Sequence, residues 1–205
     1  MTSCYQNPSP RHNAREISKL RAYPLPLRHI TLITTGGTIE KTYDEATGSL
    51  ENKRSIVRRM LKRLRIEDTS VSVIELMSKD SLVMTDDDRA RIIEAVRACG
   101  GVVKPDVASP IHGVVILHGT DTLSITGDRI AAEIGTPSVP VVLTGAFRPY
   151  EMTRSDALQN LTEAIFATGI LSPGVYCASH GRALPFPGVQ KDRERWTFVA
   201  AGTGH

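Results

Sequence analysis

The sequence predicts an α/β fold: one domain with a doubly wound, mostly parallel sheet of the flavodoxin-like or Rossmann-like kind. Short β-rich runs alternate with helical patterns, which is typical of parallel strands joined by helical crossovers. The 205 residues are 40% hydrophobic, enough for one sizeable core. The longest apolar runs, such as 114–117 and 139–143, have the length of strands and are too short to cross a bilayer. We therefore expect a soluble chain with no membrane partner.

The expected elements follow one another from residue 29 onward. Strands are expected at 29–35, 70–77, 113–120, 139–145, 174–179 and 195–202, and helices at 55–66, 85–101, 121–134 and 155–167. Residues 1–28 carry Pro, Asn, Ser, Arg and His without periodicity, and they contain no apolar signal core. We expect them to form a flexible extension before one domain at 29–205.

The helix expected from residue 85 has the clearest boundaries. Thr85 and Asp88 have the spacing of a capping box, and two glycines end the pattern at 100–101. The stripe expected to be buried consists of Ile92, Ile93, Val96 and Cys99. Cys99 is therefore expected to be a core residue and not a reactive thiol.

Charge and cysteine content exclude several classes of function. The formal net charge is only +3, so the overall balance requires neither a nucleic acid nor an anionic membrane as partner. Cys4, Cys99 and Cys177 lie far apart and show no metal-ligand spacing. We expect no disulfide framework, no metal and a reducing cytoplasm.

One helix is strongly basic. Its region carries Lys53, Arg54, Arg58, Arg59, Lys62, Arg63 and Arg65 opposite apolar residues. A nucleic-acid-binding face is one interpretation, but such runs more often form the solvated face of a helix, and this second interpretation is favoured.

Two strand ends carry the residues best suited to chemistry. The first strand ends in Thr-Thr-Gly-Gly-Thr at 34–38, and the third strand ends in His-Gly-Thr-Asp-Thr at 118–122. Ligands of open parallel sheets bind beyond the carboxyl ends of strands, and glycine lets a backbone approach them closely. The first turn lacks the spacing of a dinucleotide or Walker motif. A catalytic hydroxyl, a phosphate cradle and a structural turn remain three alternatives on this motif alone.

A threonine hydroxyl needs a partner that removes or polarises its proton. Tyr43 follows Thr38 on a polar segment, 40–50, that is typical of a mobile lid or hairpin. Lys191 is the best-placed late lysine to reach Thr120 as a base. The alternatives are a surface position for Tyr43 and a helix-capping role for Asp121.

Taken together, TTGGTI at 34–39 and HGTDT at 118–122 resemble the two signature motifs of the bacterial-type L-asparaginase family. Supporting matches are ELMSKDS at 75–81, VVLTGAFRP at 141–149 and RSDALQNL at 154–161, in the family's order. The resemblance covers about residues 29 to 200. The chain is similar to the short form of the family that lacks the C-terminal domain, so that 29–205 would correspond to the N-terminal domain.

The resemblance implies a role for each matching residue. Thr38 would be the nucleophile with Tyr43 as its hydroxyl partner, and Thr120, Asp121 and Lys191 would form a second catalytic group. Ser78 and Asp121 would bind the α-carboxylate and α-ammonium of the substrate. Gly119 and Ala146 would contribute backbone groups, and Lys79 would add a cation near the substrate carboxylate.

The implied activity is hydrolysis of L-asparagine to L-aspartate and ammonia without a cofactor, with L-glutamine as a weaker substrate. The resemblance also implies a cytoplasmic homodimer or homotetramer that binds no nucleic acid. Three alternatives remain open: a non-catalytic module that binds asparagine or aspartate, an amidotransferase subunit acting on aminoacyl-tRNA, and a flavodoxin-like nucleotide binder.

Overall fold

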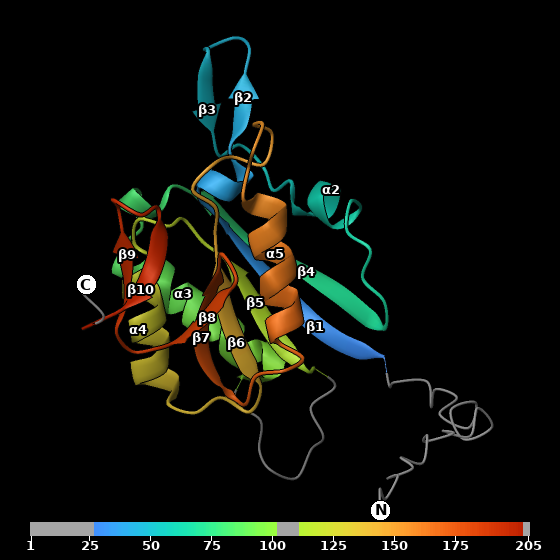
Figure 1. The fold of residues 1–205 in the computed structure, drawn as a ribbon, viewed down its shortest axis with the longest axis vertical. Coiled ribbons are helices and arrows are strands. Elements are labelled where there is room, and N and C mark those ends of the chain that lie inside the picture. Colours follow the sequence, from blue (N-terminus) through green and yellow to red (C-terminus); the bar gives the residue numbers. More distant parts are fainter. Residues whose placement is uncertain (1–26, 102–110, 203–205) are drawn as a thin grey trace, which may run out of the picture.

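The computed structural model describes residues 27–101 and 111–202. A six-stranded sheet forms its centre, in the order β4 (Thr69–Lys79), β1 (Arg28–Gly36), β5 (Gly113–Leu117), β6 (Pro140–Thr144), β7 (Gly174–Ser179) and β8 (Arg182–Pro185). Only β8 runs antiparallel to its neighbour (Figure 1). The expected mostly parallel α/β sheet is therefore confirmed, and its first five strands have the 2-1-3-4-5 order of flavodoxin-like folds.

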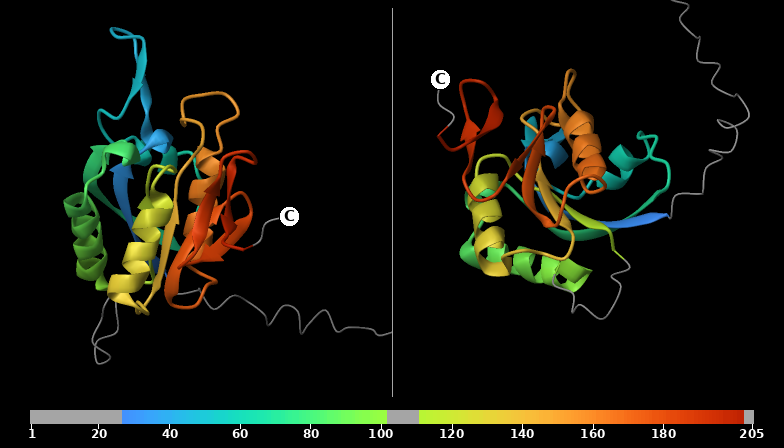
Figure 2. Two further views of the ribbon diagram at one scale, coloured as in Figure 1. Left: turned by 90° about the vertical axis from the view of Figure 1, so that its left-hand side faces the viewer. Right: turned by 60° about the horizontal axis from the view of Figure 1, so that its bottom comes forward.

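Helices cover both faces of the sheet (Figure 2). On one face α2 (Val57–Leu61) and α5 (Ala157–Ala167) bury Met60, Leu161 and Ala164 against the sheet. On the other face α3 (Asp86–Val96) and α4 (Leu123–Ile134) do the same with Ile92 and Ile130. The strands between the two layers are apolar on both sides, as expected for a doubly wound sheet.

The crossover from β6 through α5 to β7 has the opposite hand from the crossovers before it. The chain moves in the same direction across the sheet from β5 to β6 and from β6 to β7, but α4 and α5 lie on opposite faces (Figure 1). Right-handed crossovers are the strong rule in such sheets, so this left-handed one is an exception. It places the loop before α5 beside the end of β1, where the N–H of Tyr150 donates to the carbonyl of Ile39.

The helix boundaries expected around α3 are confirmed. The hydroxyl of Thr85 accepts from the N–H of Asp88, and the carboxylate of Asp88 accepts from the N–H of Thr85. The expected stripe is buried, and a π-helical turn, η3 (Arg97–Gly101), continues the helix to the two glycines.

Two expected elements differ in the structure. The basic helix is reduced to the five residues of α2, because like charges three and four positions apart repel one another and only two of its residues are buried. The last expected strand is β10 (Thr197–Ala200), which pairs with β9 (Val189–Asp192) in a separate sheet and not with the central one. The polar segment before it therefore contains a strand that its composition did not indicate.

The segment expected to be a lid or hairpin is a hairpin. It consists of β2 (Thr42–Asp44) and β3 (Ser49–Glu51) and projects from the end of the molecule where the parallel strands finish (Figure 1). Short 3-10 turns follow two strands there, η1 (Thr38–Glu40) and η2 (Ser81–Val83). No helix within residues 27–101 and 111–202 is long and apolar enough to cross a membrane. The extension expected at 1–28 lies outside the described residues except for its last two, and Arg28 already belongs to β1.

Candidate active site

The glycine turn after β1 packs directly against two neighbouring strand ends. Gly36 and Gly37 have φ of +93° and +82°, which side-chain-bearing residues rarely adopt. A Cβ atom on Gly36 would lie 2.5 Å from the backbone of Lys79, and one on Gly37 would lie 2.4 Å from Cα of Gly119. The turn is held there by a hydrogen bond of 2.8 Å from the N–H of Gly37 to the carbonyl of Lys79. The two glycines therefore permit backbone contact between three strand ends.

This contact brings the two signature turns together. The backbones of Gly37 and Gly119 touch. Thr38 directly follows the first of these glycines, and Thr120 directly follows the second. The end of β6 joins them, since a Cβ on Gly145 would lie 2.3 Å from the carbonyl oxygen of His118. Ala146, the next residue along, is fully buried beside this cluster. The carboxyl ends of β1, β5 and β6 thus form one polar surface at the point where the strand order reverses.

Lys191 reaches Thr120 from the small sheet. Its ammonium donates to Oγ1 of Thr120 at 2.8 Å and to Oδ1 of Asp121 at 3.0 Å. The same nitrogen lies 4.9 Å from the centre of the Phe147 ring, a geometry typical of cation–π contact. Lys191 is half-buried on β9, and α4 contacts this strand, so the lysine is held at the site. The expected approach of a late lysine to Thr120 is therefore present.

Two members of this cluster were not anticipated from the sequence. Arg193 donates to Oδ1 of Asp121 at 2.9 Å, and Phe147 lies under the lysine. Arg193 lies in the turn that follows β9, beyond the end of the strand, so the alternation of side chains along a strand could not have placed it beside Lys191. No spacing in the sequence pointed to Phe147.

Ser78 and Lys79 take different directions at the end of β4. The Ser78 hydroxyl is buried without a hydrogen-bond partner in the described part of the chain. Unpartnered buried hydroxyls are rare and mark places where a further polar group fits. The Lys79 ammonium instead donates to both carboxylate oxygens of Asp88 at 2.8 Å, which holds the pKa of Asp88 down at about 2. The structure thus places Ser78 near the glycine turn and directs the Lys79 side chain toward α3.

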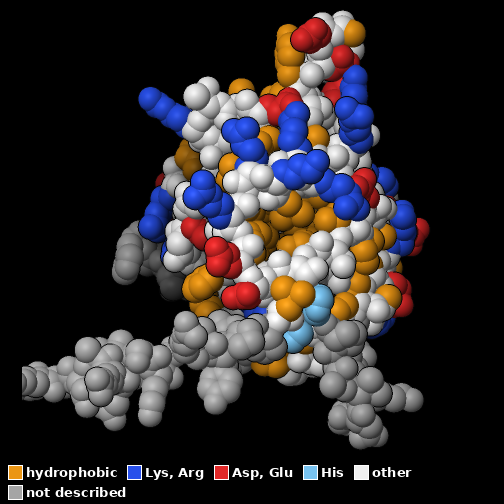
Figure 3. Space-filling view, turned by 90° about the vertical axis from the view of Figure 1, so that its right-hand side faces the viewer, with side chains coloured by type: hydrophobic (Ala, Val, Ile, Leu, Met, Phe, Trp, Pro, Cys, Tyr) orange, Lys and Arg blue, Asp and Glu red, His pale blue; other side chains and the backbone are white. Residues whose placement is uncertain are grey.

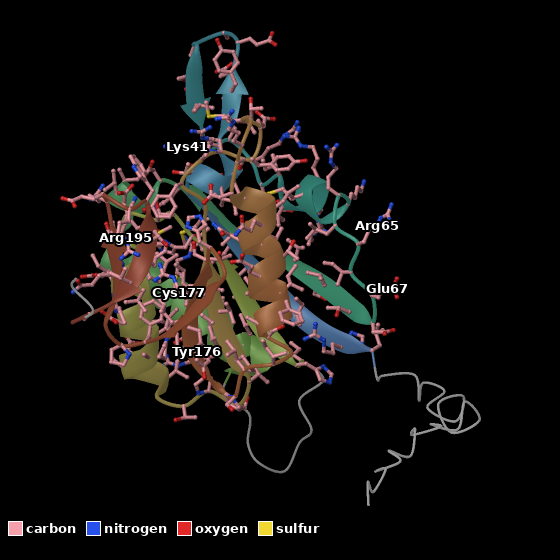
Figure 4. The ribbon with its side chains drawn as sticks, in the orientation of Figure 1. Lys41, Arg65, Glu67, Tyr176, Cys177 and Arg195 are labelled. Atoms are coloured by element: carbon pink, nitrogen blue, oxygen red, sulfur yellow. The ribbon has the colours of Figure 1, made fainter. Side chains whose placement is uncertain are left out.

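The structure does not bring Tyr43 to Thr38. Tyr43 lies on β2 with 59% of its surface exposed, and its hydroxyl is close to Gly48 at the far end of the hairpin. Its backbone N–H donates to Oε2 of Glu151 at 3.1 Å. At the base of the hairpin, Lys41 forms an ion pair of 2.7 Å with Asp80 (Figure 4). The hairpin is therefore connected to neighbouring loops while its tyrosine faces solvent.

The buried carboxyl group of Glu40 stabilises the glycine turn after β1. Glu40 is 1% exposed; its Oε2 accepts from the N–H of Gly36 at 3.2 Å, and its Oε1 accepts from the hydroxyl of Ser55. Asn52 donates to the carbonyl of Gly37 at 2.9 Å. Burial raises the pKa of Glu40, and its hydrogen bonds oppose that rise. The segment after the hairpin is thus tied to the turn that carries Thr38.

His118 has a structural place in the second signature. It is fully buried, with Nδ1 2.8 Å from the carbonyl of Gly119 and Nε2 2.9 Å from Oγ1 of Thr126. Burial lowers the pKa of His118 to about 4. A neutral imidazole at neutral pH thus links the signature turn to α4.

A family match agrees with this geometry. Residues 29–195 match the family described as asparaginase, N-terminal. The chain belongs to the asparaginase family. The match includes both signature turns, the Ser78 loop and Lys191.

Relatives of this asparaginase-family chain include two kinds of protein. A subunit of the glutamyl-tRNA(Gln) amidotransferase from Methanococcus maripaludis is 28% identical over 163 residues, which are 76% of this chain and 35% of the relative. The L-asparaginase of Thermococcus kodakarensis is 28% identical over 149 residues, which are 73% of this chain and 43% of the relative. The chain therefore spans about a third to two fifths of the length of these relatives.

Solved structures show the same fold. The thermostable L-asparaginase from Thermococcus kodakarensis superposes with a TM-score of 0.71 at 26% identity, covering 84% of this chain and 51% of that one. A probable cytoplasmic L-asparaginase from Campylobacter jejuni gives 0.64 at 28% identity, with 80% and 48% covered. L-asparaginase I from Vibrio cholerae gives 0.70 at 21% identity, covering 86% of this chain and 55% of that one, which shows the fold alone.

We predict that Gly37→Ala destabilises the protein far more than Gly48→Ala. Both glycines have positive φ, so each alanine costs about 1 kcal/mol or more in backbone conformation, and the φ of +82° and ψ of −179° at Gly37 form a combination that is essentially restricted to glycine. Only Gly37 also faces a backbone collision, and we expect its total cost to be about 3 kcal/mol or more. Urea unfolding of both variants measures the difference, and equal losses would contradict the close contact of the two turns.

The buried Glu40 predicts a pH dependence of stability. Because its pKa is raised in the folded protein, the folded state binds the proton more tightly than the unfolded state does. Stability that depends on Glu40 is therefore greatest at low pH and declines as pH rises through the raised pKa. The melting temperature of the wild type, measured relative to that of Glu40→Gln, should therefore rise as the pH is lowered from 7.5 to 5. Glu45→Gln, on the exposed hairpin, is the control. If the melting temperatures of the wild type and Glu40→Gln differ by the same amount across this pH range, the prediction is refuted.

Proposed function

We propose that the chain is an amidohydrolase that converts L-asparagine to L-aspartate and ammonia through Thr38. One observation carries the proposal: Thr38 and Thr120 each follow one of two glycines in backbone contact, and Lys191 donates to the second of these hydroxyls. A nucleophile, a second hydroxyl and a proton-carrying amine thus converge on the rim of one sheet. This is the arrangement that acyl transfer through a hydroxyl requires.

In the proposed reaction the Thr38 oxygen attacks the side-chain amide carbon of asparagine. The proton of the Thr38 hydroxyl passes to the amide nitrogen as the C–N bond breaks, so that ammonia leaves and an ester links the aspartyl group to Thr38. Water activated at Thr120 then attacks the ester and restores the hydroxyl. Lys191 assists by moving a proton to and from Oγ1 of Thr120, with which it already shares a hydrogen bond. These steps need no cofactor.

The substrate would bind through its α-carboxylate and α-ammonium. Ser78 offers a buried hydroxyl without a partner among the described residues, which suits a carboxylate. Asp121 holds Lys191 and Arg193 through Oδ1, and its Oδ2 accepts no hydrogen bond from the described residues, so this oxygen is available to an ammonium group. Gly119 and Ala146 would supply backbone groups. Lys79 would act on the substrate carboxylate only after leaving Asp88.

Tyr43 would reach Thr38 only if the hairpin closes over the site. The hairpin is a short two-stranded ribbon that projects from the molecule, and closure of such elements commonly accompanies substrate binding. The tyrosine would then share the proton of the Thr38 hydroxyl. In the conformation described, Lys191 already donates a hydrogen bond to Thr120, while Tyr43 is exposed to solvent.

We further propose a cytoplasmic setting and a single catalytic domain at 29–205, acting as a homodimer or homotetramer. The match of residues 29–195 to the family described as asparaginase, N-terminal, supports the domain proposal, and the chain covers about half of two solved asparaginase chains. L-glutamine would be a weaker substrate, because one additional methylene changes discrimination by only about 1–3 kcal/mol.

The first test measures ammonia release from L-asparagine and, separately, from L-glutamine. Wild type should release ammonia from asparagine, and Thr38→Ala should retain less than about a thousandth of that rate because its nucleophile is removed. Thr162→Ala, exposed on α5, is the control and should keep the wild-type rate. An active Thr38→Ala variant would disprove the assignment of the nucleophile.

The contributions of Lys191 and Arg193 can be separated. Both side chains donate to Oδ1 of Asp121, but only Lys191 also donates to Thr120. We expect Lys191→Ala to lower kcat by about 10²–10⁴-fold, the range for a positioned proton carrier, and Arg193→Ala to lower it less than about tenfold. Equal losses in the two variants would mean that the lysine acts only by holding Asp121.

The same assay distinguishes the two other candidates. The relatives named as amidotransferase subunits favour a subunit whose ammonia is delivered to an aminoacyl-tRNA, which predicts little ammonia release from free amino acids when that tRNA is absent. A non-catalytic module predicts no release but a rise in melting temperature with asparagine or aspartate. Release from free asparagine at a rate that depends on Thr38 would argue against both.

A further inference from the structure

A cavity lies between α2 and the loop before α5, and the proposed reaction does not use it. Its volume is about 580 Å³, and it is lined by Arg59, Arg63, Tyr150, Glu151, Met152, Arg154, Ser155 and Leu158. The residues come from α2, from the turn after it, from the loop before α5 and, for Leu158, from the first turn of α5. Neither signature turn contributes to it, so it is separate from the Thr38 site.

The cavity carries unbalanced positive charge. Arg59 forms an ion pair with Glu151, the one acidic residue of the lining. Arg63 and Arg154 form no ion pair with any residue in the described parts of the chain, and both are exposed. Arg154 also has φ of +60°, an uncommon backbone state for a residue with a side chain. Two guanidinium groups are thus left without an anionic partner, among the described residues, at one cavity.

The surrounding surface has the same sign. Figure 3 shows a band of Lys and Arg side chains across the face of the molecule that contains α2. Lys62 and Arg65, which follow α2 in the chain, form no ion pair with the described residues, whereas Arg58 of α2 pairs with Glu75. Like charges held this close repel one another, and a bound anion would relieve that repulsion.

The lining suits phosphate better than carboxylate or halide. Guanidinium groups bind phosphate oxygens in pairs, and three of them around one cavity can satisfy several oxygens at once. The Tyr150 ring lies 5.4 Å below the guanidinium carbon of Arg59, so this arginine is already oriented. The Tyr150 hydroxyl accepts or donates no hydrogen bond among the described residues and can serve as a further donor.

The cavity is also connected to the hairpin. One oxygen of Glu151 accepts from Arg59, and the other accepts from the backbone N–H of Tyr43. A phosphate bound by Arg59 would compete with Glu151 for the same guanidinium. Occupation of the cavity would therefore alter the contact that holds the first strand of the hairpin.

We propose that this cavity is a binding site for a phosphate group, held by Arg59, Arg63 and Arg154. The group could belong to a small phosphorylated compound or to the backbone of an RNA strand, since both present the same oxygens. The proposal does not depend on the activity at Thr38, and its test does not use that activity.

The test measures binding of pyrophosphate and, separately, of a short single-stranded RNA by isothermal titration calorimetry at constant ionic strength. Arg63→Ala and Arg154→Ala should each raise the Kd for the bound ligand about tenfold, which corresponds to the loss of one charge-assisted hydrogen bond. Lys62→Ala removes the same charge from the same segment but does not line the cavity, and it should change Kd less than about twofold. The variants lie at exposed positions, so folding is expected to be retained.

Each outcome has a defined meaning. Pyrophosphate binding that depends on Arg63 and Arg154 supports the site with a small ligand. RNA binding alone, with the same dependence, supports it with a strand phosphate. Equal weakening by Lys62→Ala would show a diffuse charge effect and overturn the site, as would the absence of binding by either probe at millimolar concentration.

Discussion

Backbone contact between three strand ends is the constraint on which the rest of the site depends. The turn at Gly36–Gly37 lies so close to Lys79 and Gly119 that no side chain fits between them. Thr38 and Thr120 directly follow the touching glycines Gly37 and Gly119, so the backbone itself holds the two threonines near each other. No long flexible side chain is needed to bring them together. Preorganised groups lose little freedom on reaction, which is why catalytic sites are built on rigid scaffolds.

Support for the turn comes from segments that are distant in the sequence. Glu40, Asn52 and Ser55 connect it to the chain after the hairpin, and the backbone of Tyr150 connects it to the loop before α5. This loop lies there because the crossover into β7 passes over the same face as α2. The unusual hand of one crossover therefore determines what borders both the glycine turn and the basic cavity.

Charge organises the Thr120 cluster and the basic cavity in different ways. Around Thr120 the cations Lys191 and Arg193 both form ion pairs with Asp121, so the groups are mutually oriented. At the cavity only Arg59 is paired, with Glu151, while Arg63 and Arg154 form no ion pair with the described residues. The first arrangement suits the movement of protons between fixed partners, whereas the second suits an external anion. Glu151 and the hairpin are the structural link between them.

Local signals in the chain were enough to predict the sheet, the helices around it and the two signature turns. Periodicity, caps and glycine pairs depend only on residues that are close together in the sequence. They also pointed to Lys191, although the pairing of β9 with β10 in a separate sheet was not visible in a polar segment. Packing between distant segments decided that Arg193 and Phe147 join the lysine, that Lys79 turns to Asp88 and that Tyr43 faces solvent. Such outcomes depend on which side chains meet across elements far apart in the chain, and no local pattern encodes that geometry.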